Sequence, residues 1–134
     1  MVGIVIVSHS CKVAEGIYDL VMQMASENDH IFPAGGLEDG SIGTDAFKIR
    51  EAIEKADTGD GVAVLADLGS GIMSAETAIE LLEFDDEHSD IQVRIADAPI
   101  LEGAVSAAVS ASAGDSLDDV IAAAEEARGM KKLE

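Results

Sequence analysis

The chain has 134 residues, and 48% of them are hydrophobic, so it is long and apolar enough to bury the core of a single domain. Only 3% are aromatic, which leaves few platforms for stacking nucleic-acid bases. The 27 acidic residues outnumber the 8 basic ones, and the net charge of −19 argues against nucleic acids and anionic membranes as partners. We therefore expect one domain over residues 1–134, with a flexible tail at 130–134.

Cysteine content and apolar runs indicate the compartment. Cys11 is the only cysteine, so an internal disulfide is excluded and a reducing environment is expected. The sequence starts without a basic leader, and its apolar runs are far shorter than the roughly 20 residues that span a bilayer. We therefore expect a cytoplasmic protein. The acidic surplus also favours a halophilic source, because molar salt shortens the Debye length to about 3 Å and screens self-repulsion.

The first predicted element is a strand at Ile4–Val7, an unbroken apolar run that ends in Ser8, His9 and Ser10. Helical spacing then predicts a helix from about Ser10 to Ala25. Its apolar stripe consists of Val13, Ile17, Leu20, Val21 and Met24.

A short strand at 31–34 follows, and Pro33 marks it as a sheet edge because proline cannot donate to a strand ladder. The next ten residues, 35–44, contain four glycines and read as a loop. Thr44 is the expected N-cap of a second helix. The buried stripe of that helix is Ile49, Ala52, Ile53 and Ala56.

The third predicted strand, Val62–Ala66, is again continuously apolar and ends in the polar turn Asp67–Gly71. A third helix follows, with one face formed by Ile72, Ala75, Ile79 and Leu82. Residues 91–95 alternate between apolar and polar side chains, which is typical of a strand with one exposed face at the other edge of a sheet.

Two helices are predicted at the end of the chain. The alanine-rich segment Ile100–Ala113 ends before Gly114. Ser116 then caps the last helix, with Asp119 at the capping-box position. The apolar stripe of this helix is Leu117, Val120, Ile121 and Ala124.

Strands that alternate with helices imply parallel βαβ units with right-handed crossovers. The first and third strands look fully buried, whereas the second and fourth look like edges. We therefore predict a doubly wound α/β fold with a mostly parallel four-stranded sheet of order 2-1-3-4 and helices on both faces. The topological switch falls between the first and third strands, which is where such sheets bind ligands.

The two turns at this switch predict a reactive histidine. His9 and Asp67 should be neighbours, and a carboxylate that accepts a hydrogen bond from one ring nitrogen leaves the other nitrogen as a nucleophile. If Asp67 holds Nδ1, then Nε2 is that nucleophile. The backbone N–H groups of Gly69, Ser70 and Gly71 at the start of a helix form a cradle for an anion such as phosphate. The combination favours phosphoryl transfer through phosphohistidine.

A family resemblance covers nearly the whole chain. It rests on the segments 3–10, 13–16, 34–36, 39–44, 67–70 and 98–104, which read GIVIVSHS, VAEG, AGG, DGSIGT, DLGS and APILEGA. These segments closely resemble the mannose-type IIA family of the sugar phosphotransferase system. The DGSIGT and DLGS segments resemble the branch of that family that serves phosphoenolpyruvate-dependent dihydroxyacetone kinase. The family fold is a doubly wound α/β sheet, and its members are typically homodimers.

The resemblance implies a chain of transfers without a cofactor. His9 takes a phosphoryl group from the phosphocarrier HPr and passes it to ADP on the nucleotide-binding subunit of the kinase. Asp67 orients His9, and Ser10, Gly36 and Thr44 join the predicted cradle on the phosphate or partner side. Family members with fused carrier domains are longer, so the donor is expected in trans. The alternative within the family is transfer to the IIB domain of a mannose-type sugar transporter.

The sequence departs from the family pattern at Gly71, Met73 and Ser74, where Ala and Met-Asn are expected. Several of these residues also have a purely structural interpretation. A histidine at a strand end is commonly a turn residue, Asp67 and Ser70 also suit a helix start, and Cys11 suits a small buried site. No spacing typical of a metal site occurs. This sequence has no acidic pair after its first strand, as a phospho-aspartate receiver domain would need. It also has few aromatic residues to sandwich the flavin of a flavodoxin-like module.

Overall fold

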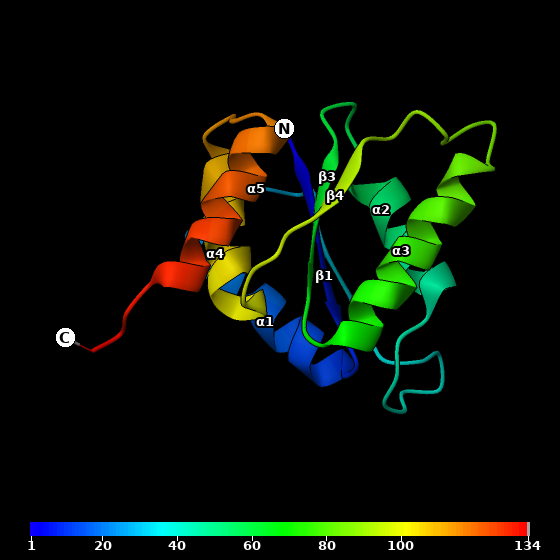
Figure 1. The fold of residues 1–134 in the computed structure, drawn as a ribbon, viewed down its shortest axis with the longest axis horizontal. Helices are drawn as coiled ribbons and strands as arrows, with labels where there is room; N and C mark the ends of the chain where they lie inside the picture. Colours follow the sequence, from blue (N-terminus) through cyan, green and yellow to red (C-terminus); the bar gives the residue numbers. More distant parts are fainter. Residues whose placement is uncertain (134) are drawn as a thin grey trace.

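The computed structural model describes residues 1–133, and it contains one parallel four-stranded sheet with the strand order β2-β1-β3-β4 (Figure 1). This is the predicted order. The strands are β1 (Gly3–Ser8), β2 (Ile31–Gly35), β3 (Val62–Ala66) and β4 (Val93–Ile95). The helices are α1 (Cys11–Met24), α2 (Ala46–Ala56), α3 (Gly69–Glu83), α4 (Ile100–Ser112), α5 (Leu117–Glu126) and the 3-10 helix η1 (Ala127–Gly129).

Helices cover both faces of the sheet and divide the core in two. In Figure 1, α1, α4 and α5 lie on one side of the strands, and α2 and α3 lie on the other. Because successive side chains of a strand point to opposite faces, Ile4 and Ile6 of β1 pack with the first group and Val5 and Val7 with the second. Every residue of β1 is buried. Full burial of such a side chain stabilises the fold by about 1.5–3 kcal/mol, so β1 anchors both halves of the core.

The strand register brings three loops to one end of the sheet. Ser8 of β1 lies opposite Gly35 of β2, and Val7 lies opposite Ala66 of β3. The residues that follow β1, β2 and β3 therefore meet at the same edge. This is the edge at which open α/β sheets carry their reactive groups.

The predicted helix faces of α1 and α3 were partly wrong. In α1 the buried residues are Ala14, Ile17 and Val21, whereas Leu20 of the predicted stripe is 55% exposed. Val13 and Met24 are exposed as well. In α3 the buried face runs through Gly71, Ala75, Ala78 and Leu82, and Ile72 is exposed. The buried face of α3 is therefore formed mostly by small residues, whereas that of α1 combines Ala14 with Ile17 and Val21 and is narrower than the predicted stripe.

Two element boundaries also differ from the prediction. The N-cap of α2 is Asp45, which accepts a hydrogen bond from the backbone N–H of Phe47 at 2.9 Å, so Thr44 lies one residue before the cap. Strand β4 contains only three residues, Val93–Ile95, which pair with Val62–Val64 of β3, and the carbonyl of Gln92 just before them still accepts from the N–H of Val62 at 2.8 Å. Ser116 caps α5 as expected and accepts from the N–H of Asp119.

No helix within residues 1–133 is long and apolar enough to span a membrane. Residues 130–133 form no regular element, although Lys132 pairs with Glu102 at 2.7 Å. Glu134 lies outside the described residues. The flexible tail therefore stays a prediction.

Candidate active site

His9 and Asp67 meet at the C-terminal ends of the two central strands. His9 follows β1 directly, and Asp67 follows β3 directly. Nδ1 of His9 lies 2.9 Å from Oδ1 of Asp67, and the two side chains are 19% and 18% exposed. The strand order placed these residues side by side in the prediction, and the structure brings them into contact although they are 58 positions apart.

The Asp67 carboxylate accepts four hydrogen bonds. Oδ1 accepts from Nδ1 of His9 and from the N–H of Leu68 at 2.8 Å. Oδ2 accepts from the Ser8 hydroxyl at 2.8 Å and from the N–H of His9 at 3.1 Å. Partial burial opposes ionisation, but the bonds from Ser8, His9 and Leu68 outweigh it and lower the pKa of Asp67.

This carboxylate determines the tautomer of His9. An ionised carboxylate has no proton to donate, so the proton of the Nδ1–Oδ1 bond belongs to the imidazole. In the neutral ring, Nε2 then carries the lone pair. Asp67 thus bonds to Nδ1, as the sequence prediction supposed. The ring nitrogen that is left with a lone pair is Nε2.

Nε2 of His9 faces the start of α3, where it contacts the Ser70 hydroxyl. No side chain caps α3, and Ser70 is engaged with His9 instead. Among the described residues, the backbone N–H groups of Gly69 and Ser70 have no partner, as is usual in the first turn of a helix. The N–H of Gly71 donates to the carbonyl of Leu68 at 2.9 Å, so this N–H is engaged, and the part of Gly71 in an anion cradle stays a prediction.

Gly71 contributes space instead. A Cβ atom at this position would lie 3.3 Å from Oδ1 of Asp67 and 3.6 Å from Cε1 of His9. The departure from the family pattern at this residue therefore leaves the imidazole edge less crowded than an alanine would.

The glycine-rich loop fastens the end of β1. The N–H of Gly36 donates to the carbonyl of Ser8 at 3.1 Å, and the N–H of Gly43 donates to the carbonyl of His9 at 2.8 Å. Gly36 has a positive φ of 70°, a conformation that favours glycine. The Thr44 hydroxyl bonds to that of Ser74 at 2.6 Å and ties the loop to α3. Gly36 and Thr44, predicted on the phosphate or partner side, thus also hold the loop in place.

Two serines frame the histidine. Ser10 caps α1 by accepting from the N–H of Val13 at 3.2 Å, and its own N–H donates to the Ser8 hydroxyl at 3.1 Å. Ser8 is fully buried and bonds to Asp67, but the sequence prediction did not single it out. The only signal was a small polar residue directly before a histidine at the end of an apolar strand.

Exposed large apolar side chains occur in the two segments that adjoin this site, the glycine-rich loop and the start of α3. Leu68 stands next to Asp67, and Ile42 stands next to Gly43, which bonds to His9. We call the exposed group at the start of α3 and in the glycine-rich loop the apolar rim: it comprises Ile42, Leu68, Ile72 and Met73. An exposed apolar group beside a reactive side chain is typical of a docking surface.

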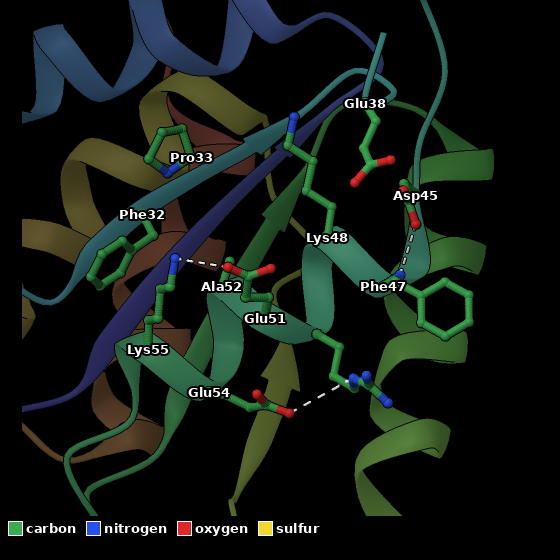
Figure 2. Close-up of a pocket in the computed structure, with 11 residues that line it drawn as sticks. Phe32, Pro33, Glu38, Asp45, Phe47, Lys48, Glu51, Ala52, Glu54 and Lys55 are labelled. Atoms are coloured by element: carbon green, nitrogen blue, oxygen red, sulfur yellow. Dashed lines mark hydrogen bonds and ion pairs between the residues drawn. The ribbon is translucent and has the colours of Figure 1, made fainter. Parts of the chain in front are cut away.

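The hollow with a volume of about 500 Å³ shown in Figure 2 lies elsewhere, between β2 and α2, and neither His9 nor Asp67 lines it. Its basic side chains are engaged: Lys55 pairs with Glu51 at 2.9 Å, and Lys48 donates to the carbonyl of Gly35 at 2.7 Å. The candidate reaction site is therefore the contact between His9 and Asp67 and not this hollow.

A second histidine cluster lies near the C-terminal end of α2. Nδ1 of His88 is 2.9 Å from Asp85 and 3.7 Å from Glu54, and Nε of Arg50 lies 3.7 Å from Glu54. The hydrogen bond to Asp85, aided by the charges of Glu54 and Glu87, raises the pKa of His88 against a smaller effect of burial. Within residues 1–133, Glu54, Asp85 and His88 form the only group of three histidine, cysteine or acidic side chains close enough to share a metal ion. The sequence prediction missed it because its members come from separate segments.

Comparison with known proteins decides the family. Residues 3–121 match the family described as PTS system fructose IIA component, EIIA-man. The chain belongs to this family. The motif resemblance is thereby confirmed at the level of the family.

Relatives in the family carry a more specific name. The chain is 45% identical over 124 residues to "PEP-dependent dihydroxyacetone kinase, phosphoryl donor subunit DhaM" of Escherichia coli, covering 90% of this chain and 26% of the relative. The subunit of the same name in Providencia stuartii is 39% identical over 135 residues, covering 98% and 28%. The chain thus spans about a quarter of the length of these two relatives. The chain is also 39% identical to "PEP-dependent dihydroxyacetone kinase 2, phosphoryl donor subunit DhaM" of Listeria innocua, and this match covers 90% of this chain and 94% of that subunit.

Solved structures agree on the fold. A crystal structure of a protein of unknown function superposes with a TM-score of 0.81 at 35% identity and covers both chains completely. The phosphotransferase system component EIIA from Streptococcus agalactiae superposes with a TM-score of 0.68 at 18% identity over 98% of this chain and 97% of its own. The second likeness speaks for the fold alone.

Proposed function

We propose that this chain is a phosphohistidine carrier, the phosphoryl donor subunit of a dihydroxyacetone kinase. Nε2 of His9 accepts the phosphoryl group from phosphorylated HPr and passes it to ADP held on the nucleotide-binding subunit of the kinase. The observation that carries the proposal is the bond between Nδ1 of His9 and Asp67, which leaves the Nε2 lone pair facing the start of α3. The names of the DhaM relatives support the choice of kinase.

The first transfer forms a bond between Nε2 and phosphorus and breaks the bond between phosphorus and the HPr nitrogen. The proton on Nδ1 stays in place, and the positive charge that develops on the ring is stabilised by the Asp67 carboxylate. The incoming phosphoryl oxygens meet the free N–H groups of Gly69 and Ser70 and the Ser70 hydroxyl, at the positive end of the α3 dipole.

The second transfer reverses this geometry. An oxygen of the ADP β-phosphate attacks phosphorus, the bond to Nε2 breaks, and ATP forms on the partner while His9 regains its lone pair. The hydrogen-bond partners of His9 and Asp67 include no lysine or arginine. With a net charge of −19, the chain offers little attraction for a free nucleotide, which supports ADP held by the partner.

Partner docking is assigned to the apolar rim around His9. An acidic surface attracts basic partner faces at low salt, but molar salt screens that attraction. Exposed apolar side chains contribute to binding affinity at low salt and at molar salt alike. We propose that HPr and the kinase subunit each contact this rim in turn, because each must reach the same Nε2 atom.

The remaining assignments belong to the same proposal. Residues 1–134 act as one IIA domain, in the cytoplasm and as a homodimer. The alternative acceptor is the IIB domain of a mannose-type sugar transporter. The two acceptors differ in their chemistry, because the kinase branch delivers the phosphoryl group to a nucleotide and the transporter branch delivers it to another protein side chain.

The test is a reconstituted transfer. The protein is incubated with enzyme I, HPr and phosphoenolpyruvate, and intact mass spectrometry is used to look for one acid-labile phosphoryl group. We expect an adduct on the wild type and none on His9→Ala. The purified phosphoprotein is then mixed with either the ADP-loaded kinase subunit or a IIB domain. ATP formation with the first supports the proposal, whereas discharge only onto the second establishes the alternative. An undiminished adduct on His9→Ala contradicts both.

A further inference from the structure

Ser8 is the last residue of β1, and its side chain is fully buried beside the reaction site. The N–H of Ser10 donates to the Ser8 hydroxyl at 3.1 Å, so one lone pair of that oxygen is occupied. The hydroxyl proton is then free to point at Oδ2 of Asp67, which lies 2.8 Å away. Ser8 therefore donates to the carboxylate in a fixed direction.

The orientation of the Asp67 carboxylate depends on Ser8 because the bond from Ser8 is the shorter of the two that Oδ2 accepts. Oδ1 holds Nδ1 of His9, and Oδ2 is held by the N–H of His9 at the longer distance of 3.1 Å and by Ser8. Among residues 1–133, Ser8 is the only side chain apart from His9 that bonds to Asp67. Without it, Oδ2 loses its shorter bond, and the carboxylate plane gains freedom to turn away from Nδ1.

The backbone around Ser8 is held in place as well. Its carbonyl accepts from the N–H of Gly36, and Ser8 lies opposite Gly35 in the strand register. A Cβ atom on Gly35 would stand only 2.5 Å from the carbonyl oxygen of Ser10, so the turn is packed tightly against β2. Both the backbone position of Ser8 and the direction of its hydroxyl are therefore fixed.

We propose that Ser8 is a positioning residue: its hydroxyl holds the Asp67 carboxylate in the orientation that keeps the proton of His9 on Nδ1 and the lone pair on Nε2. The effect on phosphoryl transfer rests on the proposed function. The effect on the tautomer does not, because it concerns only the resting protein.

Two measurements on Ser8→Ala test this inference. Nitrogen-15 NMR of the imidazole reports which nitrogen carries the proton. The wild type should show one tautomer, protonated on Nδ1, and Ser8→Ala should show a mixture. The rate of phosphoryl acceptance from phosphorylated HPr should fall by about tenfold, the expected effect of losing a hydrogen bond to a charged group.

The chain offers a matched control at Ser110 of α4. Its hydroxyl donates to Asp115 at 2.7 Å, and the residue is only 8% exposed, so Ser110→Ala also removes a buried bond from serine to aspartate. This variant should lose stability comparably but keep the His9 tautomer and the transfer rate. Ser8→Thr restores a hydroxyl and should restore the single tautomer.

The outcomes separate the two proposals. Absence of any adduct on the wild type overturns the proposed function, while the tautomer of Ser8→Ala still decides the role of Ser8. If the wild type is phosphorylated but Ser8→Ala retains a single Nδ1–H tautomer and a wild-type rate, the inference is wrong. Equal changes in Ser8→Ala and Ser110→Ala reduce Ser8 to a structural role and also overturn it.

Discussion

Two histidines of this chain place Nδ1 at the same distance, 2.9 Å, from an aspartate oxygen, yet only one of them is suited to attack a phosphoryl group. His9 bonds to Asp67 at the ends of β1 and β3. His88 bonds to Asp85 in the connection after α3. The first pair is 19% and 18% exposed, and the second is 32% exposed on each side. The bond between histidine and aspartate is therefore not what distinguishes a nucleophile.

The surroundings make the difference. Asp85 and the further charges of Glu54 and Glu87 raise the pKa of His88, which favours an imidazolium without a lone pair. At the other site, four donors share the charge of Asp67, and Nε2 of His9 faces the N-terminus of α3. A helix N-terminus attracts the phosphoryl group to be transferred. In the function that we propose, position in the fold thus distinguishes the nucleophilic histidine from a common ion pair.

The largest expected effect separates the two histidines directly. His9→Ala should abolish acceptance of the phosphoryl group from HPr, because the attacking nitrogen is gone. His88→Ala should accept at the wild-type rate, because His88 lies near the C-terminal end of α2, away from the reaction site. Initial rates of adduct formation by mass spectrometry make the comparison. Loss of the adduct in His88→Ala, in a folded protein, would reverse the assignment.

The next effect concerns the two aspartates. Asp67→Ala should slow phosphoryl acceptance by about 10- to 100-fold, because the growing positive charge on His9 loses a hydrogen-bonded carboxylate. Asp85→Ala removes the equivalent bond from His88 and should leave the rate unchanged. Circular dichroism should show both variants folded. Equal rates for wild type and Asp67→Ala would mean that the carboxylate and the imidazole are not coupled in the reaction.

A smaller effect appears in the pH dependence of stability. The pKa of His88 is raised in the folded protein, so its ion pairs stabilise fully below its ordinary value of 6.5 and are lost as pH rises through the raised value. We expect the wild type to have a slightly higher unfolding midpoint than His88→Gln at about pH 6, and no difference at about pH 9. Molar salt should narrow the difference at the lower pH. A difference that grows with pH would contradict this sign.

The smallest effect is expected at Gly71. In Gly71→Ala the new Cβ lies 3.3 Å from Oδ1 of Asp67. Because four donors hold the Asp67 carboxylate in place, its contact with His9 must adjust slightly. We expect the transfer rate to fall less than about tenfold, below the effect of removing a full hydrogen bond. Gly16→Ala in α1 is the control, since beyond the neighbouring backbone of its own helix no atom lies within 4 Å of the new Cβ. It should raise stability by about 0.5–1 kcal/mol and leave the rate unchanged.

Much of the fold followed from patterns along the sequence. Two continuously apolar strands, one strand with Pro33 and one alternating strand were enough to predict the sheet order, because burial on one or both faces leaves a clear periodicity. Helical periodicity was only partly right for α1 and α3. Leu20 and Ile72 of the predicted stripes are exposed, because small residues such as Ala14 and Ala78, which hydrophobicity ranks low, take part in the buried faces instead.

The site was predictable where it depended on topology and not where it depended on local geometry. The contact between His9 and Asp67 follows from the neighbouring ends of β1 and β3. The Ser8 hydroxyl, the cap at Asp45 and the use of the Gly71 N–H depend on single rotamers and turns, which spacing does not determine. The pairing of His88 with Glu54 joins segments that no motif connects.

The central claim is that Nε2 of His9 carries the phosphoryl group while Nδ1 keeps its proton for Asp67. NMR of the phosphoprotein labelled with nitrogen-15, read through the coupling between phosphorus and nitrogen, tests it directly. We expect phosphorus bound to Nε2 of His9 and a protonated Nδ1. A phosphoryl group on Nδ1, or on His88, would contradict it.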